Sequence, residues 1–211
     1  MAAAPRSPAD RRAQILEVAV RLLDAVPFDD LSMDQVAAEA GVSSPLLFHY
    51  FKNKHGFRNA VLEASAIELQ QRMTPDALLP VPAQLRAGVE TFAEAVIAHP
   101  TIYLAVMRMA GSGDQSMRKI YRGMRRTFTQ WIGSSLAQFG VPTTPALEAA
   151  IQGWQAFMEE IVLSWVDDPT MTRSEMIDLC ERGFYCLLPA AGVDVSGIDL
   201  AAAASEAGLA T

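Results

Sequence analysis

Residues 32–54, with the sequence SMDQVAAEAGVSSPLLFHYFKNK, predict two short helices joined by a tight turn, and this pattern limits the possible folds strongly. Ser32 is placed to accept a hydrogen bond from the backbone N–H of Gln35, three residues on. The Gln35 side chain can reach back to the Ser32 amide, which completes a capping box. Gly41 follows where the chain must turn sharply, because glycine takes a positive φ without steric cost. Ser43 or Ser44 is then well placed as the N-cap of the second helix.

The second helix is predicted to bury one side and to present its N-terminal part outward. We expect Leu47, Phe48 and Phe51 to point inward. The side chains that this leaves outward are Ser44, Pro45, Leu46, His49 and Tyr50. The major groove of DNA admits a helix presented in this way, so the geometry predicts a DNA-reading hairpin.

The residues of this hairpin match a known family pattern. The run Ala37-x-x-Ala40-Gly41-Val42-Ser43, followed by Leu47-Phe48-His49-Tyr50-Phe51-Lys52-x-Lys54, closely resembles the helix-turn-helix signature of TetR-type transcriptional regulators. The segment before it resembles the family's first helix and the aromatic residue after the following loop, through Ile15, Leu16, Ala19, Leu22, Leu23 and Phe28. The specific resemblance covers about residues 10–60. The remaining chain is similar to the family in helix number and order alone.

The resemblance implies a set of DNA-binding residues and no catalytic residues. The set is Ser32, Ser43, Ser44, Pro45, Leu46, Phe48, His49, Tyr50, Lys52 and Lys54. Three positions depart from the family pattern: Pro27 stands where glycine is common, Leu46 where threonine or serine is usual, and Phe48 where tyrosine is common. The last two departures remove hydroxyl groups that could contact phosphate. Recognition is therefore expected to depend more on backbone amides, Tyr50, His49 and Lys54.

Breaker residues recur at helical spacing along the rest of the chain, without strand alternation or internal repeats. We predict an all-α fold of about nine helices, with an N-terminal three-helix head that contains the helix-turn-helix and a C-terminal helical ligand-binding and dimerisation domain. The predicted divisions are a flexible arm at 1–9, the DNA-binding domain at 10–56 with its motif at about 32–51, the ligand-binding and dimerisation domain at 57–190, and a weakly ordered tail at 191–211.

The net charge of −7 is distributed unevenly. Residues 1–60 carry seven Lys/Arg and seven acids, so the remaining chain holds the whole excess of negative charge. We therefore expect only the head to approach DNA. Arg6, Arg11 and Arg12 either touch phosphates or a minor groove or form a solvated tail, and the sequence favours neither interpretation.

Cysteine and hydropathy patterns predict a cytoplasmic protein without a membrane span or a secretory signal. No run of about eighteen apolar residues occurs, and the first residues lack an apolar region. Cys180 and Cys186 lie six apart in one predicted helix and face different sides, which predicts reduced core thiols rather than a disulfide or a metal site. No cofactor is expected.

The C-terminal half is rich in large apolar residues that can line an effector pocket or simply fill the core. The pocket candidates are Phe92, His99, Tyr103, Met107, Tyr121, Met124, Phe128, Trp131, Trp154, Phe157 and Met158. Arg118, Arg122 and Arg125 share one helical face and either attract an anionic group or balance the charge of neighbouring helices. The dimer-interface candidates, on stripes that a monomer core explains equally well, are Ile151, Gly153, Ile161, Trp165, Ile177 and Phe184.

The resemblance implies a homodimeric, sequence-specific DNA-binding regulator, most often a repressor, that a small hydrophobic effector releases from a palindromic operator. One alternative is a helical small-molecule carrier or enzyme with an incidental helix-turn-helix. The chain shows no HExxH, CxxC or nucleophile–base pattern, which argues against an enzyme. A regulator without a small-molecule effector is a second alternative that the sequence leaves open.

Overall fold

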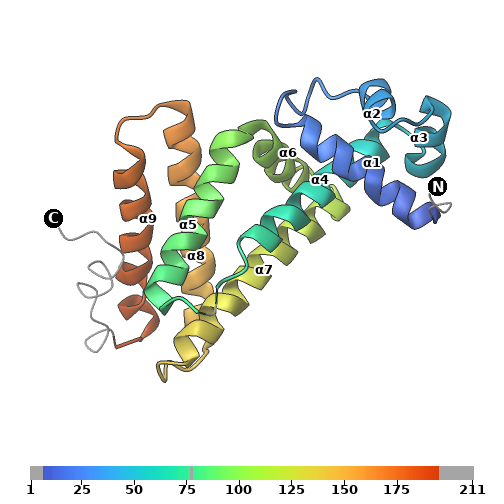
Figure 1. Ribbon diagram of the computed structural model, residues 1–211. Coiled ribbons are helices and arrows are strands. Elements are labelled where there is room, and N and C mark those ends of the chain that lie inside the picture. Colours follow the sequence, from blue (N-terminus) through green and yellow to red (C-terminus); the bar gives the residue numbers. More distant parts are fainter. Residues whose placement is uncertain (1–6, 77, 195–211) are drawn as a thin grey trace. The chain divides into compact units, whose positions relative to one another are not determined.

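The computed structural model describes residues 7–76 and 78–194. Over these residues the chain forms nine α-helices, one short 3-10 helix and no strand, so the predicted all-α fold is confirmed (Figure 1). The helices are α1 Pro8–Leu22, α2 Met33–Glu39, α3 Ser44–Phe51, α4 Lys54–Arg72, α5 Val81–Ala98, α6 Pro100–Gly111, α7 Gln115–Ala137, α8 Pro145–Asp167, α9 Arg173–Leu187 and η1 Pro189–Ala191. The predicted weakly ordered tail lies largely outside the described residues.

Short-range capping interactions fix where several helices begin. Ser7 caps α1 and Thr172 caps α9, each in a capping box with the acidic residue three positions on, Asp10 or Glu175. Asp114 acts similarly before α7, since its Oδ1 accepts from the Met117 amide at 3.0 Å. This backbone hydrogen bond is the main reason why the pKa of Asp114 is lowered.

The described residues form two compact units, and the first contains the predicted head. It is built from residues within Met1–Leu69 and Ala98–Tyr121, which means α1 to α3, most of α4, α6 and the start of α7. Its core joins side chains from all of these helices, including Ile15, Phe28, Val36, Leu47, Phe57, Val61, Val106 and Met117. The helix-turn-helix therefore shares one hydrophobic core with α6 and the first part of α7.

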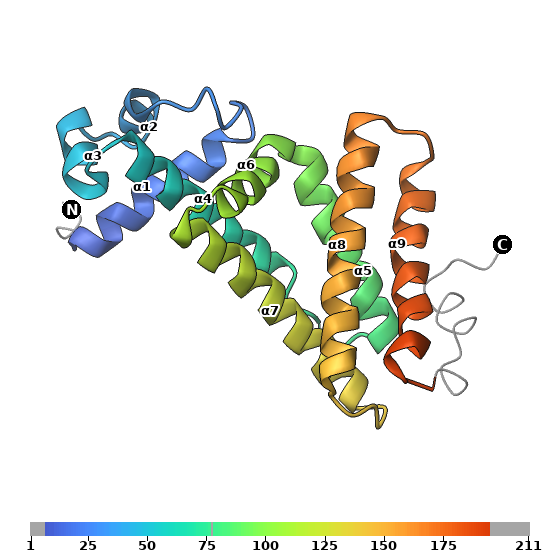
Figure 2. The ribbon, with the colours of Figure 1, turned by 180° about the vertical axis from the view of Figure 1, so that it is seen from behind.

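The second unit comprises the described residues within Gln70–Ile97 and Arg122–Thr211. In it α8 and α9 run antiparallel and pack along each other (Figures 1 and 2). Trp154 of α8 is central to this contact, because its Nε1 donates to the Cys180 carbonyl at 2.8 Å and its ring lies edge-on to Phe184 at 5.1 Å. The core of the second unit also includes Val89, Phe92, Val96, Leu136, Leu147, Ile151, Met158, Val162, Met176 and Ile177.

The two cysteines of α9 differ in their environment. Both are free, as predicted, and Cys180 is buried, which raises the pKa of its thiol to about 11. Cys186 is exposed, so its assignment as a core thiol is wrong. Six residues on a helix turn the side chain by about 240°, so when Cys180 faces the core Cys186 faces solvent.

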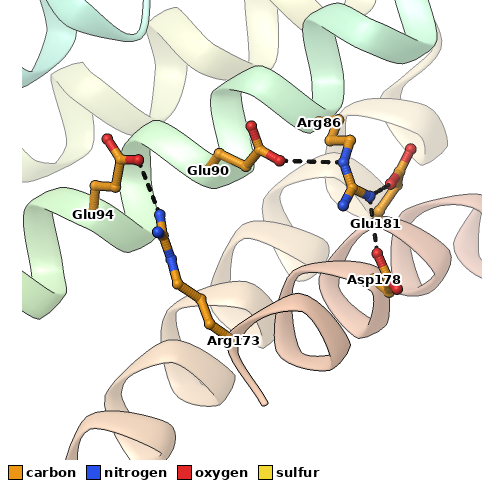
Figure 3. Close-up of polar contacts among 6 residues, drawn as sticks. All are labelled: Arg86, Glu90, Glu94, Arg173, Asp178 and Glu181. Carbon is orange, nitrogen blue, oxygen red and sulfur yellow. Dashed lines mark hydrogen bonds and ion pairs between the residues drawn. The ribbon is translucent and has the colours of Figure 1, made fainter. Parts of the chain in front are cut away.

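A small ionic network joins α5 to α9 in the second unit (Figure 3). Arg86 Nη1 lies 2.8 Å from Glu181 and 2.9 Å from Asp178, while its Nε lies 3.2 Å from Glu90. Burial alone would lower the pKa of Arg86, but the hydrogen bonds to both α9 carboxylates outweigh burial and raise it. Burial also raises the pKa of Glu181, although Arg86 opposes that shift. Arg86 thus compensates a partly buried carboxylate.

An Arg86→Met substitution is expected to destabilise the second unit by about 2 kcal/mol at pH 7, because it leaves Glu181 buried without a cation. The more exposed Asp178 is screened by water and contributes less. Because the folded-state pKa of Glu181 is raised, the loss of stability caused by Arg86→Met should be absent below the unfolded-state pKa of Glu181. The loss should appear as the pH rises through the folded-state pKa of Glu181. Urea unfolding at pH 4 and pH 7 measures this difference.

The matched control for that experiment is Arg173→Met. Arg173 pairs with Glu94 at 2.9 Å, also between α9 and α5, but both side chains are about half exposed (Figure 3). We expect a loss of about 0.5 kcal/mol or less, with little dependence on pH. Equal losses for Arg86→Met and Arg173→Met would contradict the role assigned to Arg86.

Candidate nucleic-acid interface

The turn between α2 and α3 has the local structure that the sequence predicts. Ser32 Oγ accepts from the Gln35 amide at 3.2 Å, and Gln35 Oε1 accepts from the Ser32 amide at 3.0 Å, so the capping box of α2 is confirmed. Gly41 adopts a φ of +64°, in the left-handed region that favours glycine. The chain can therefore leave α2 and enter α3 within four residues.

Two serines share the start of α3. Ser43 occupies the N-cap position, but its side chain makes no capping hydrogen bond. The Ser44 hydroxyl instead donates to Asp34 Oδ1 of α2 at 2.6 Å. This contact links the two helices of the hairpin and fixes α3 relative to α2.

The orientation of α3 differs from the prediction at two residues. Leu47 and Phe51 are buried as expected, but Phe48 is 50% exposed, so its inward assignment is wrong. Tyr50, which was expected to face outward, is partly buried and packs against the core of the first unit. Because Leu47 and Phe51 are four apart, they define the buried side, and Phe48 is rotated by about 100° from Leu47.

The outer side of α3 consequently carries a small group of exposed residues. Pro45, Phe48 and His49 are exposed, while Leu46 is partly buried. This side is mainly apolar, and His49 contributes its hydrogen-bonding side chain.

The chain passes from α3 to α4 through a strained turn at Lys52. Lys52 has φ +66° and ψ −47°, and the Asn53 amide donates to the Phe51 carbonyl at 2.8 Å. These values are close to those of a γ-turn of the rare, strained kind. Asn53 Oδ1 then accepts from the Gly56 amide at 2.8 Å and caps α4. Lys52 and Lys54 are both exposed at this junction.

Arg58 of α4 holds the loop before α2, a role that sequence patterns did not indicate. Its guanidinium carbon lies 4.0 Å from the centre of the buried Phe28 ring, and Nη2 lies 2.7 Å from Asp29 Oδ1. Nη1 also donates to the Phe28 carbonyl at 3.3 Å. The partners are about thirty residues apart, so no local spacing rule could have paired them.

A Ser32→Ala substitution is expected to lower the free energy of unfolding by about 1 kcal/mol, because it removes the acceptor that caps α2. Denaturant unfolding of the full chain measures this loss. Ser43→Ala is the control, since Ser43 also stands at an N-cap but makes no capping hydrogen bond. A loss from Ser43→Ala as large as that from Ser32→Ala would contradict the assignment.

Comparison with known proteins agrees with this geometry. Residues 15–61 match the family model described as bacterial regulatory proteins, tetR family. A solved TetR-family transcriptional regulator from Streptomyces coelicolor superposes with a TM-score of 0.75 at 26% identity, over 89% of this chain and 84% of the other. This chain belongs to the TetR family.

Two curated relatives support membership in the TetR family. An uncharacterised helix-turn-helix-type transcriptional regulator of Mycobacterium tuberculosis is 26% identical over 70% of this chain and 64% of its own length. The helix-turn-helix-type transcriptional regulator EthR of Mycolicibacterium smegmatis is 27% identical over 61% of this chain and 58% of its own. The chain thus spans less than two thirds of the length of these relatives.

In this TetR-family chain the pocket candidates are divided between the two compact units. His99, Tyr103, Met107 and Tyr121 belong to the first, and Phe92, Met124, Phe128, Trp131, Trp154, Phe157 and Met158 to the second. His99 is the N-cap residue of α6, and its Nε2 lies 3.3 Å from Asp24 Oδ1. In the second unit the Phe128 and Trp131 ring centres are 5.3 Å apart.

The second unit also buries three polar side chains. Thr129, Gln155 and Glu159 are each at most 6% exposed. Gln155 Nε2 donates to Thr129 Oγ1 at 3.0 Å, and Arg125 pairs with Glu159 at 2.9 Å and donates to the Gln152 carbonyl. For Arg125 the structure therefore supports charge balance with α8. Gln155 and Glu159 stand four and eight residues after Ile151, on the buried stripe, which is the signal that could have revealed them.

The dimer-interface candidates separate into covered and accessible residues. Ile151, Ile177 and Phe184 are at most 4% exposed within the chain, so they offer no surface to a partner and their assignment needs correction. Gly153 is exposed, whereas Ile161 and Trp165 are partly buried. The Trp165 indole N–H also donates to the Met171 carbonyl, at 2.7 Å.

Over the described residues, no helix combines the length and apolar character needed to cross a bilayer.

Proposed function

We propose that this protein is a homodimeric, sequence-specific DNA-binding transcriptional regulator that acts in the cytoplasm. The observation that carries the proposal is the α2–α3 hairpin, in which α3 is anchored through Leu47 and Phe51 and leaves its opposite side exposed. A helix held in this way can enter a major groove with its outer side chains on base edges. The relatives that the chain resembles are named as transcriptional regulators, which supports the same function.

The proposed contact set keeps the ten residues of the sequence prediction, with roles adjusted to their environments. Exposed Lys52 and Lys54 suit phosphate contacts. Exposed Pro45, Phe48 and His49 suit contacts to base edges. Ser32, Ser44 and Tyr50 have partners within the protein and are expected to act by positioning α2 and α3. Ser43 and Leu46 flank the contact surface.

Dimerisation is proposed through the accessible side of α8. Ala149, Gly153 and Ala156 are exposed at spacings that place them on one side of this helix, and Phe157 beside them is 37% exposed. The Phe157 ring lies over Gly183 of α9, where an added Cβ would stand 2.6 Å from Phe157 Cε1. Small residues permit close helix approach, and the Phe157 ring offers an apolar contact to a second copy. A dimer would reach two half-sites about 34–36 Å apart or a multiple of that spacing.

We further propose that the second unit binds a small, largely hydrophobic effector that weakens operator binding. The aromatic residues of α7 and α8 provide apolar area, and the buried Thr129–Gln155 pair provides polar groups that can orient a ligand. An effector shifts the protein away from the DNA-binding state only as far as it binds the other state better, and DNA weakens effector binding by the same factor. This coupling would make the protein a repressor that its effector releases.

The test is to select duplexes from a random pool with the purified full chain and to titrate the enriched sequence at several salt concentrations. An inverted repeat whose affinity falls with salt supports a dimeric DNA-binding regulator. No enrichment at low salt would overturn the proposal. Compounds that raise the thermal midpoint and release the enriched duplex would identify the effector.

A further inference from the structure

The outer side of α3 is unusually poor in hydrogen-bonding groups for a surface that is proposed to face DNA bases. Phe48 is 50% exposed, and exposed Pro45 lies three residues before it on the same helix. Ser44 already donates to Asp34, and Tyr50 packs against the core. Within α3, His49 is thus the exposed residue with hydrogen-bonding nitrogens.

An exposed phenyl ring can discriminate among base edges through their chemistry. In the major groove adenine, guanine and cytosine present donors and acceptors, whereas thymine adds a 5-methyl group. A phenyl ring that covers a donor or an acceptor leaves it without a partner, and this costs free energy. A ring that covers a methyl group removes apolar area of both partners from water instead. Phe48 therefore matches thymine better than the other bases.

We infer that Phe48 is a specificity-determining residue that contacts a thymine methyl group in each operator half-site. This inference rests on the proposed function and deepens it, because it names the chemical feature that α3 selects. Lys52, four residues after Phe48, and Lys54 lie exposed at the end of α3 and the start of α4, so cations for the flanking phosphates accompany the apolar ring. An apolar partner protein would not need those cations.

The experiment removes the methyl group without changing base pairing. In the duplex enriched by selection, each thymine is replaced singly by deoxyuridine, and dissociation constants are measured for the wild-type chain and for Phe48→Ala. For the wild type we expect about a fourfold weakening for each contacted methyl group removed. For Phe48→Ala, thymine and uracil at that position should bind equally.

Two further variants keep the test decisive. Phe48→Leu retains an apolar side chain and should keep part of the preference for thymine, which also serves if Phe48→Ala binds too weakly to titrate. Phe139→Ala is the matched control, because Phe139 is another exposed phenylalanine but lies outside the contact set, and this variant should retain the full preference for thymine over uracil.

The possible failures can be told apart. If a duplex is enriched but the wild type is indifferent to every uracil, or if Phe48→Ala and Phe48→Leu remain as sensitive as the wild type, the inference is overturned and the proposed function stands. If no duplex is enriched, the proposed function fails first. Capture of a protein through Phe48 together with indifference to uracil would assign the exposed ring to that partner instead.

Discussion

Replacing Phe157 by glutamate is expected to convert the proposed dimer into a monomer and to weaken binding to a complete palindromic operator by about 100-fold or more, because the two half-sites are then bound independently. Phe157 is 37% exposed on α8, so the carboxylate can reach water in the monomer and should leave the fold intact. At the proposed interface the same carboxylate would be buried without a partner, which is costly. Sedimentation and operator titration measure the two effects.

The matched control is Phe139→Glu. Phe139 is more exposed, at 62%, and lies in the loop between α7 and α8 rather than on α8 itself. We expect it to leave the oligomeric state and the operator affinity unchanged. A Phe157→Glu chain that remains dimeric with wild-type affinity would show that this side of α8 is not the interface.

The features that sequence analysis predicted correctly at the hairpin depend on residues close together in the chain. The capping box of Ser32 and Gln35 spans three residues, and the turn at Gly41 depends on one backbone conformation. Such interactions are nearly independent of tertiary packing. The all-α fold class follows for the same reason, since the proline and glycine breaks separate segments with helical periodicity.

The orientation of α3 was harder to predict because the helix has only eight residues. Over two turns, the hydrophobic pattern fits two orientations of the helix almost equally well. One buries Leu47 and Phe51 alone, and the other also buries Phe48. Packing of Tyr50 against the core of the first unit decides between them. The contacts of Arg58 with Phe28 and Asp29 depend on tertiary structure altogether.

The same limit explains the mixed outcome in the second unit. Periodicity identifies the apolar stripes of α8 and α9, but it does not show which of them the chain covers itself. Trp154 and Phe184 pack against each other, and Ile151 and Ile177 are buried, so these stripes are core. The side of α8 proposed as the interface instead combines Phe157 with small residues that carry almost no hydrophobic signal.

Lys52 provides the second large effect, in which stability and DNA binding change in opposite directions. Its φ of +66° costs a residue with a Cβ about 1–3 kcal/mol, and the Asn53 hydrogen bonds hold it there. Lys52→Gly removes that strain but adds about 1 kcal/mol of unfolded-state entropy. We therefore expect a net gain of about 1 kcal/mol in the free energy of unfolding, measured with denaturant.

DNA binding should respond to the same substitution in the other direction. If Lys52 neutralises one phosphate in each subunit, a dimer of Lys52→Gly loses two contacts, which corresponds to about a 30-fold weaker affinity near physiological salt and a salt slope smaller by about 2. Lys52→Ala is the matched control, because alanine removes the charge but keeps the strained Cβ. It should bind DNA as weakly as Lys52→Gly without the gain in stability.

Wild-type affinity for both variants would exclude Lys52 from the DNA contact, and equal stability of both would show that the turn stores no strain. If Lys52→Gly is more stable but binds DNA less tightly, then Lys52 is a strained residue that is kept for its function in DNA binding.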